Sequence, residues 1–200
     1  MAAKTVDRRD QFLEVALHLF AEKGYHATSI SDIIESANVA RGTFYNYFEN
    51  KRQIFAQLLD NLFEDVVSVG FPIDITSEKG IPAQVHRLMA GFCLKLLSNL
   101  SMSKVLLEHA VGLDAEANEQ LKRFYDRVYA RIRKAITDGQ QLKIVRQGNP
   151  SVIATSLLGM LKESLYQQIL GTNQDSPEAM VEEIYAVATK GILLIPPGEV

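Results

Sequence analysis

Apolar side chains recur at helical spacing along almost the whole chain. In the first segment Phe12, Ala16 and Phe20 stand four residues apart, which places them on one face of a helix. Comparable stripes follow, without sustained strand-like alternation or a fixed-period repeat. The stripes predict helices over about 6–24, 41–47, 51–68, 82–100, 103–111, 115–138, 151–170 and 177–194, with one more between Ser29 and Asn38. The predicted fold class is all-α, with about nine helices.

A break in the pattern divides the chain into two predicted domains. Gly70-Phe71-Pro72 interrupts the long fourth stripe, and a loop continues to Gly80. We predict an N-terminal three-helix head over 1–68, which includes the start of a linking fourth helix. The larger helical body then spans 69–200.

The segment between Ser29 and Lys51 has the start and stop signals of a helix-turn-helix. Ser29 can cap a helix, with Asp32 three residues later in the place of the acidic partner in a capping box. Asn38 tolerates the left-handed conformation that ends a helix. Lys51 then opens the fourth helix, whose free N–H groups and dipole favour an anion such as phosphate.

The third predicted helix has an aromatic inner face and a polar outer face. Phe44 and Phe48 are four residues apart and can share one buried side, which turns Gly42, Thr43 and Asn46 outward. Such a helix suits the major groove of DNA, where Arg and Asn pair with base edges. Taken alone, the same pattern also fits a small amphipathic helix with Tyr side chains at its boundary.

The full order from Thr28 to Lys51 reads T-S-I-x-x-I-I-x-x-A-x-V-x-x-G-T-F-Y-x-Y-F-x-N-K, and it resembles the DNA-binding domain of TetR-family transcriptional repressors. The match extends upstream through Phe12, Ala16 and Phe20, so it covers roughly the first third of the chain. Two positions depart from the family pattern. Asn38 stands where Gly is usual, and Ala40 stands where Ser or Thr caps the recognition helix, a loss of about 0.5–2 kcal/mol.

The resemblance implies a homodimeric regulator that binds a palindromic double-stranded DNA operator and is released by a small, often hydrophobic effector. We expect base contacts from Arg41, Gly42 and Asn46. Phosphate contacts are expected from Ser29, Ser31, Thr43, Tyr45, Tyr47 and Lys51, and for Lys51 the resemblance implies the same role.

Composition and charge narrow the function classes. The net charge of −3 argues against a generally basic nucleic-acid coat but allows a small local DNA surface. The single cysteine, Cys93, excludes an internal disulfide, and its apolar neighbours favour a core residue over a redox switch. Without an apolar run of membrane-spanning length or a signal-peptide core, we expect a soluble cytoplasmic protein with no membrane partner.

No residue pattern in the sequence supports catalysis, a cofactor or a metal site. The four histidines His18, His26, His86 and His109 lack the spacing of zinc ligands. A ligand cavity is expected in the body mainly because of the resemblance, since the same residues also describe an ordinary core. Its candidate lining is Phe63, Met89, Phe92, Cys93, Leu96, His109, Phe124, Tyr125, Leu161 and Tyr166.

The last two predicted helices are candidates for a dimer interface. The stretch VIATSLLGML is apolar almost all round, and a helix without a polar face must be covered on both sides. The interface residues we expect are Ala154, Leu158, Gly159, Leu161, Ile184, Tyr185 and Ala188. Both helices can instead be central core of a single chain.

Two other classes of protein remain open from the residues alone. One is an all-helical enzyme with an incidental helix-turn-helix, and the other is an adaptor whose apolar final helices bind a different protein.

Overall fold

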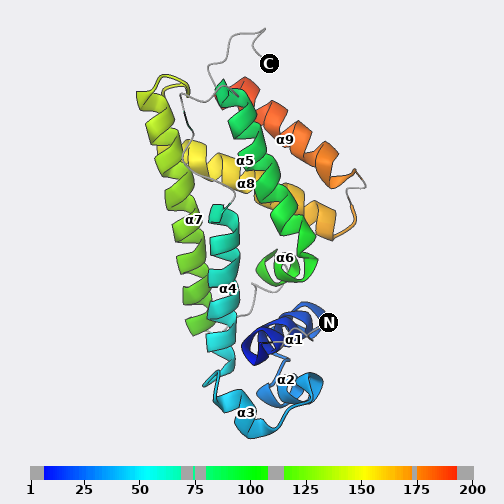
Figure 1. Ribbon diagram of the computed structural model, residues 1–200. Coiled ribbons are helices and arrows are strands. Elements are labelled where there is room, and N and C mark those ends of the chain that lie inside the picture. The colour runs from blue at the N-terminus through cyan, green and yellow to red at the C-terminus, as the bar shows by residue number, and fades with distance from the viewer. Residues whose placement is uncertain (1–6, 69–73, 75–79, 108–114, 173–174, 193–200) are drawn as a thin grey trace, which may run out of the picture. The chain divides into compact units, whose positions relative to one another are not determined.

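The computed structural model describes residues 7–68, 74, 80–107, 115–172 and 175–192, and it confirms the predicted all-α class (Figure 1). Within these residues the elements are α1 (Arg8–Lys23), α2 (Ile30–Ala37), α3 (Arg41–Tyr45), α4 (Lys51–Ser68), α5 (Gly80–Ser98), α6 (Leu100–Leu107), α7 (Ala115–Gln141), α8 (Pro150–Ile169) and α9 (Pro177–Ile192). Most bounds lie within three residues of the expected ones. The expected end of the sixth helix near 111 falls outside the described residues.

Helix α3 is shorter than predicted. It ends at Tyr45 instead of residue 47, because the chain tightens there into i to i+3 bonds. The Asn46 N–H donates to the Thr43 carbonyl at 3.3 Å, and the Tyr47 N–H donates to the Phe44 carbonyl at 2.9 Å.

Contacts between elements divide the chain into two compact units. Unit 1 contains Met1–Leu62 and Leu100–Phe124, and unit 2 contains Phe63–Asn99 and Tyr125–Val200. Helices α4 and α7 run continuously from one unit into the other. The sequence predicted a domain boundary at 68/69 because the Gly-Pro loop follows there. The two compact units differ from this prediction in that α6 belongs with the head, because α6 packs against α1.

Each unit has its own apolar core. In unit 1, α1 packs against α2 and α6, and its Phe12, Ala16 and Phe20 are buried as predicted. In unit 2, α5, α8 and α9 pack against one another. Near the end of α7, Gly139 packs closely against Val145. A Cβ atom added to Gly139 would lie 2.6 Å from the Val145 Cγ2 atom.

In the described part of the chain, no single helix has both the length and the apolar character needed to cross a membrane, although the bent pair α5 and α6 meets that test by length and composition when taken together.

Candidate DNA interface and ligand cavity

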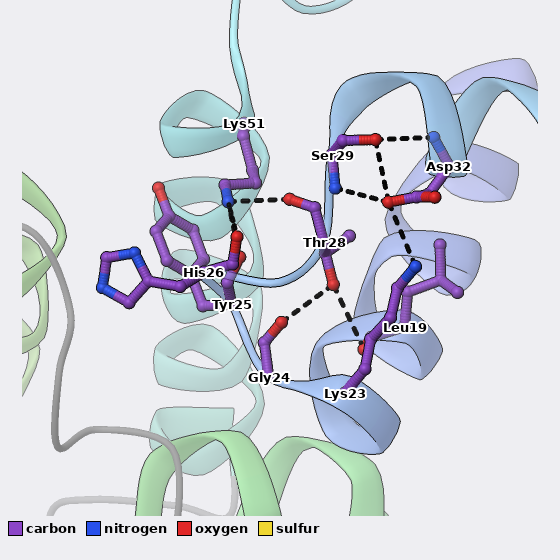
Figure 2. Close-up of polar contacts among 9 residues, drawn as sticks. All are labelled: Leu19, Lys23, Gly24, Tyr25, His26, Thr28, Ser29, Asp32 and Lys51. Atoms are coloured by element: carbon purple, nitrogen blue, oxygen red, sulfur yellow. Dashed lines mark hydrogen bonds and ion pairs between the residues drawn. The ribbon is translucent and has the colours of Figure 1, made fainter.

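Helix α2 begins with a complete capping box. The Ser29 Oγ accepts from the Asp32 N–H at 3.1 Å, and the Asp32 Oδ2 accepts from the Ser29 N–H at 2.6 Å (Figure 2). The bond from the Ser29 N–H, a second bond from the Ser29 hydroxyl to the Asp32 Oδ2 at 2.8 Å, and Lys23 Nζ at 3.0 Å lower the pKa of Asp32 to about 2. At the other end Asn38 adopts the left-handed conformation, with φ 51° and ψ 53°. Both signals read from the sequence therefore fix the ends of this helix.

The inner side of α3 is held by aromatic rings. Phe44 and Phe48 are buried, and both contact Phe12 of α1, with ring centroids 5.3 Å and 6.4 Å apart in edge-to-face geometry. The Arg9 guanidinium lies 5.1 Å from the Phe48 ring centroid and donates to the Gln57 Oε1 at 2.8 Å. The helix is thus fixed from behind by α1, whose Arg9 also contacts α4.

The outer side of α3 faces solvent. Arg41, Gly42 and Asn46, the three residues predicted to contact bases, are all exposed. An added Cβ at Gly42 would meet no atom within 4 Å, so this glycine is not required for packing within the chain. Ala40 precedes the helix with an extended backbone and makes no side-chain cap, as its departure from the family pattern predicts.

The residues predicted to hold phosphate are placed differently from one another. Ser31 and Tyr45 are exposed, the latter to 45%. Thr43 and Tyr47 are half-buried. Ser29 is exposed, but its hydroxyl already takes part in the cap of α2. All five residues belong to α2, α3 or the turns that flank these helices.

Lys51, the sixth, makes contacts that the sequence did not indicate. Its ammonium donates to the carbonyls of Tyr25 at 2.5 Å and Thr28 at 2.7 Å, and lies 3.5 Å from that of His26 (Figure 2). It also lies 4.2 Å from the centroid of the Tyr25 ring. Thr28 itself is buried and donates to the Gly24 carbonyl at 2.9 Å. The first residue of α4 is therefore tied to the turn between α1 and α2.

Unit 2 contains an apolar cavity of about 190 Å³. It is lined by residues of α5, α7, α8 and α9, together with Phe63 in the second half of α4 and Val145 between α7 and α8. The lining residues are Phe63, Val85, Leu88, Met89, Phe92, Cys93, Val128, Arg131, Ile132, Ala135, Ile136, Val145, Leu157, Leu158, Leu161 and Ile184. Five of the residues predicted to line a ligand site, namely Phe63, Met89, Phe92, Cys93 and Leu161, lie in this wall.

The other candidate pocket residues lie elsewhere. Leu96 is buried without reaching the cavity wall, and Phe124 is buried in unit 1. Tyr125 and Tyr166 are half-buried, and desolvation raises the pKa of Tyr125 to about 12. His109 lies outside the described residues. Cys93 is buried, and its desolvation raises the pKa of its thiol to about 12.

The predicted dimer residues divide into covered and open positions. Ala154, Ile184 and Ala188 are already buried within the single chain. Leu158, Leu161 and Tyr185 are half-buried, and the Tyr185 hydroxyl donates to the Pro82 carbonyl at 3.2 Å. Gly159 is exposed, and an added Cβ would meet no atom within 4 Å. Among the described residues, no group of three or more His, Cys, Asp or Glu is placed to hold a metal ion.

Comparison with known proteins agrees with this arrangement. Residues 12–58 match the family model described as bacterial regulatory proteins, tetR family. The chain is 24% identical over 181 residues to the HTH-type transcriptional repressor DhaR of Mycobacterium sp. strain GP1, covering 88% of this chain and 90% of that protein. It is 20% identical over 191 residues to IcaR of Staphylococcus aureus strain Newman, the negative transcriptional regulator of the biofilm operon icaADBC, covering 90% and 96%.

A solved structure shows the same architecture. The crystal structure of a TetR-family transcriptional regulator from Syntrophomonas wolfei superposes with a TM-score of 0.79 at 29% identity, covering 92% of this chain and 93% of that one. These relatives are transcriptional regulators, not enzymes.

The contacts of Lys51 predict a role in stability. Replacing Lys51 with Met keeps an apolar stem but leaves the Tyr25 and Thr28 carbonyls without this donor. We expect the free energy of unfolding to fall by about 1.5–3 kcal/mol in urea denaturation followed by circular dichroism. Arg52→Met removes only an exposed ion pair with Glu116 and should cost less than about 1 kcal/mol. Equal losses in the two variants would contradict the role assigned to Lys51.

The lowered pKa of Asp32 predicts a pH-dependent contribution to stability. The pKa falls from 3.8 to about 2 on folding, so the stabilisation is present above 3.8 and disappears as the pH falls through about 2. We expect the difference in unfolding free energy between the native chain and Asp32→Asn to shrink steadily as the pH falls through this window. A difference that stays constant with pH would show that the carboxylate charge does not stabilise the cap.

Proposed function

Because residues 12–58 carry the DNA-binding domain of the TetR family of transcriptional regulators, we propose that the chain is a homodimeric repressor. It binds a palindromic operator in the cytoplasm and leaves it when a small apolar ligand fills the cavity of unit 2. Its role requires binding and not catalysis. The observation that carries the proposal is the exposed polar face of α3, backed by buried aromatic rings.

In this proposal α3 enters the major groove with Arg41 and Asn46 facing base edges. Gly42 has open space above its backbone, so the main chain can approach the DNA closely. Ser31, Tyr45 and the other predicted phosphate contacts would hold the register of the helix on the duplex, because phosphate contacts position a protein without reading sequence. Two-fold symmetry would place the second α3 about 34 Å away, one turn along the duplex.

Helix α4 is the proposed link between ligand and operator. Its first residue, Lys51, holds the turn before α2, and its Phe63 lines the cavity. A ligand that changes the packing around Phe63 therefore acts on the helix that begins beside the DNA-binding elements. Ligand and operator affinities must then be coupled reciprocally.

The outward faces of α8 and α9 are the proposed dimer interface. Val152 of α8 and Val187 of α9 are exposed to 60% and 58%, so a partner subunit that covered these faces would bury apolar surface. Gly159 on α8 leaves room for a neighbouring helix. The buried Ala154, Ile184 and Ala188 would support this face from beneath without touching the partner.

Selection of bound duplexes from a random pool tests the DNA-binding proposal. We expect inverted repeats to be enriched. Against the selected operator, Asn46→Ala should lose about 1–3 kcal/mol of discrimination at one base pair in each half-site, whereas Asn61→Ala on α4 should change nothing. A pool without an enriched duplex would overturn the function, and unchanged discrimination in Asn46→Ala would overturn the assigned orientation of α3.

Sedimentation equilibrium tests the dimer interface. Gly159→Arg introduces a charge into the proposed seam while the monomer has room for it and gains helix propensity. We expect folded monomers for this variant. Leu142→Arg places the same charge at another exposed apolar position, 48% exposed and just after α7, and should leave the dimer intact. Dimers that persist in Gly159→Arg would place the interface elsewhere.

A further inference from the structure

The apolar cavity of unit 2 adjoins a row of cations on α7. Val128 and Ile132 of this helix line the cavity. Arg127, Arg131 and Lys134 on the same helix line a second, more open hollow. Phe63 and Arg131 belong to the walls of both hollows, so the apolar interior and the cationic surface meet at these two residues.

The charges around the second hollow are predominantly positive. Its wall contains three basic residues and one acidic residue, Glu64. The Arg127 guanidinium stacks 3.7 Å from the Phe63 ring centroid and lies 3.5 Å from the Glu64 carboxylate. Lys134 pairs with Asp138 at 2.7 Å. Arg131, one helical turn from each of these cations, is the basic residue that also reaches the apolar wall.

From this arrangement we propose that the ligand of the body is an amphiphilic anion, with an alkyl tail in the cavity and a carboxylate or phosphate head at Arg131. The proposal rests on the proposed regulatory function and specifies its ligand class. An arginine stem can lie along apolar surface while its guanidinium binds an anionic oxygen pair through two parallel hydrogen bonds. A cationic head group would instead meet Arg127, Arg131 and Lys134, which repel it.

The size of the cavity sets the length of the tail. An apolar cavity of about 150 Å³ is known to hold benzene, which has six carbon atoms. The 190 Å³ here therefore fits a tail of roughly six to eight carbon atoms. Because the walls are apolar apart from Arg131, the tail needs no polar group along its length.

Calorimetric titration of the full chain without DNA tests the ligand class directly. The four probes are octanoate, octyl phosphate, 1-octanol and octylammonium, which share one tail and differ in the head group. We expect at least one anion to bind about tenfold more tightly than 1-octanol, with octylammonium the weakest. The comparison of octanoate with octyl phosphate identifies which anion the site prefers.

Two variants locate the head and the tail. Arg131→Gln should weaken the preferred anion about tenfold and leave 1-octanol unchanged, whereas Arg133→Gln, on the same helix but outside both hollow walls, should change neither. Ala135→Leu fills part of the cavity and should weaken all the probes that bind. Equal affinities for the anions and 1-octanol, or no binding of any probe, would overturn the proposal.

Operator affinity separates this proposal from the proposed function. If the preferred anion binds through Arg131 but operator affinity does not change, the ligand class stands and induction by that ligand fails. If only 1-octanol releases the operator, regulation stands and the anionic ligand class fails.

Discussion

The proposed DNA-binding surface depends on the packing of two phenylalanines against a third. A helix as short as α3 is not stable alone, because nucleation costs more than five residues can return. Phe44 and Phe48 provide the missing stabilisation by packing beside Phe12, where each aromatic contact adds about 0.5–1.5 kcal/mol beyond burial. Because these aromatic contacts are all on the inner face, the outer face is left to Arg41 and Asn46.

Lys51 connects the start of α4 to the turn between α1 and α2. Its ammonium donates hydrogen bonds to carbonyl oxygens that follow the end of α1, so the turn before α2 and the start of α4 are held by one side chain. A charge engaged in this way is less free to reach a phosphate. The same residue can still strengthen DNA binding indirectly, because it ties the residues before α2 to the residue that follows α3 and its turn.

The parts of the molecule that the sequence predicts are those set by local rules. The capping box of Ser29, the left-handed Asn38 and the helical stripes each depend on residues within a few positions, and the structure contains them all. The early end of α3 depends on a local change to i to i+3 hydrogen bonds, which no residue type in this segment predicts. The carbonyl contacts of Lys51 join positions more than twenty residues apart, which spacing along the chain does not reveal.

The cavity illustrates the same limit. An apolar residue on a body helix can line a hollow or fill a core, and the two differ only in packing. Phe92 and Cys93 reach the cavity wall, whereas Leu96, one turn further along α5, does not. The sequence did not predict the second, cationic hollow. In sequence, Arg127, Arg131 and Lys134 resemble an ordinary solvated helix face, and only the structure places Phe63 beside them.

Cys93 gives the cavity a built-in reporter. It is the only cysteine of the chain, it forms part of the cavity wall, and its burial keeps the thiol protonated near neutral pH. An alkylating reagent can reach the sulfur only when α5 and its neighbours separate. The rate of Cys93 labelling therefore measures how often the cavity opens. A molecule that occupies the cavity would lower this rate, and the measurement needs no dye, tag or engineered residue.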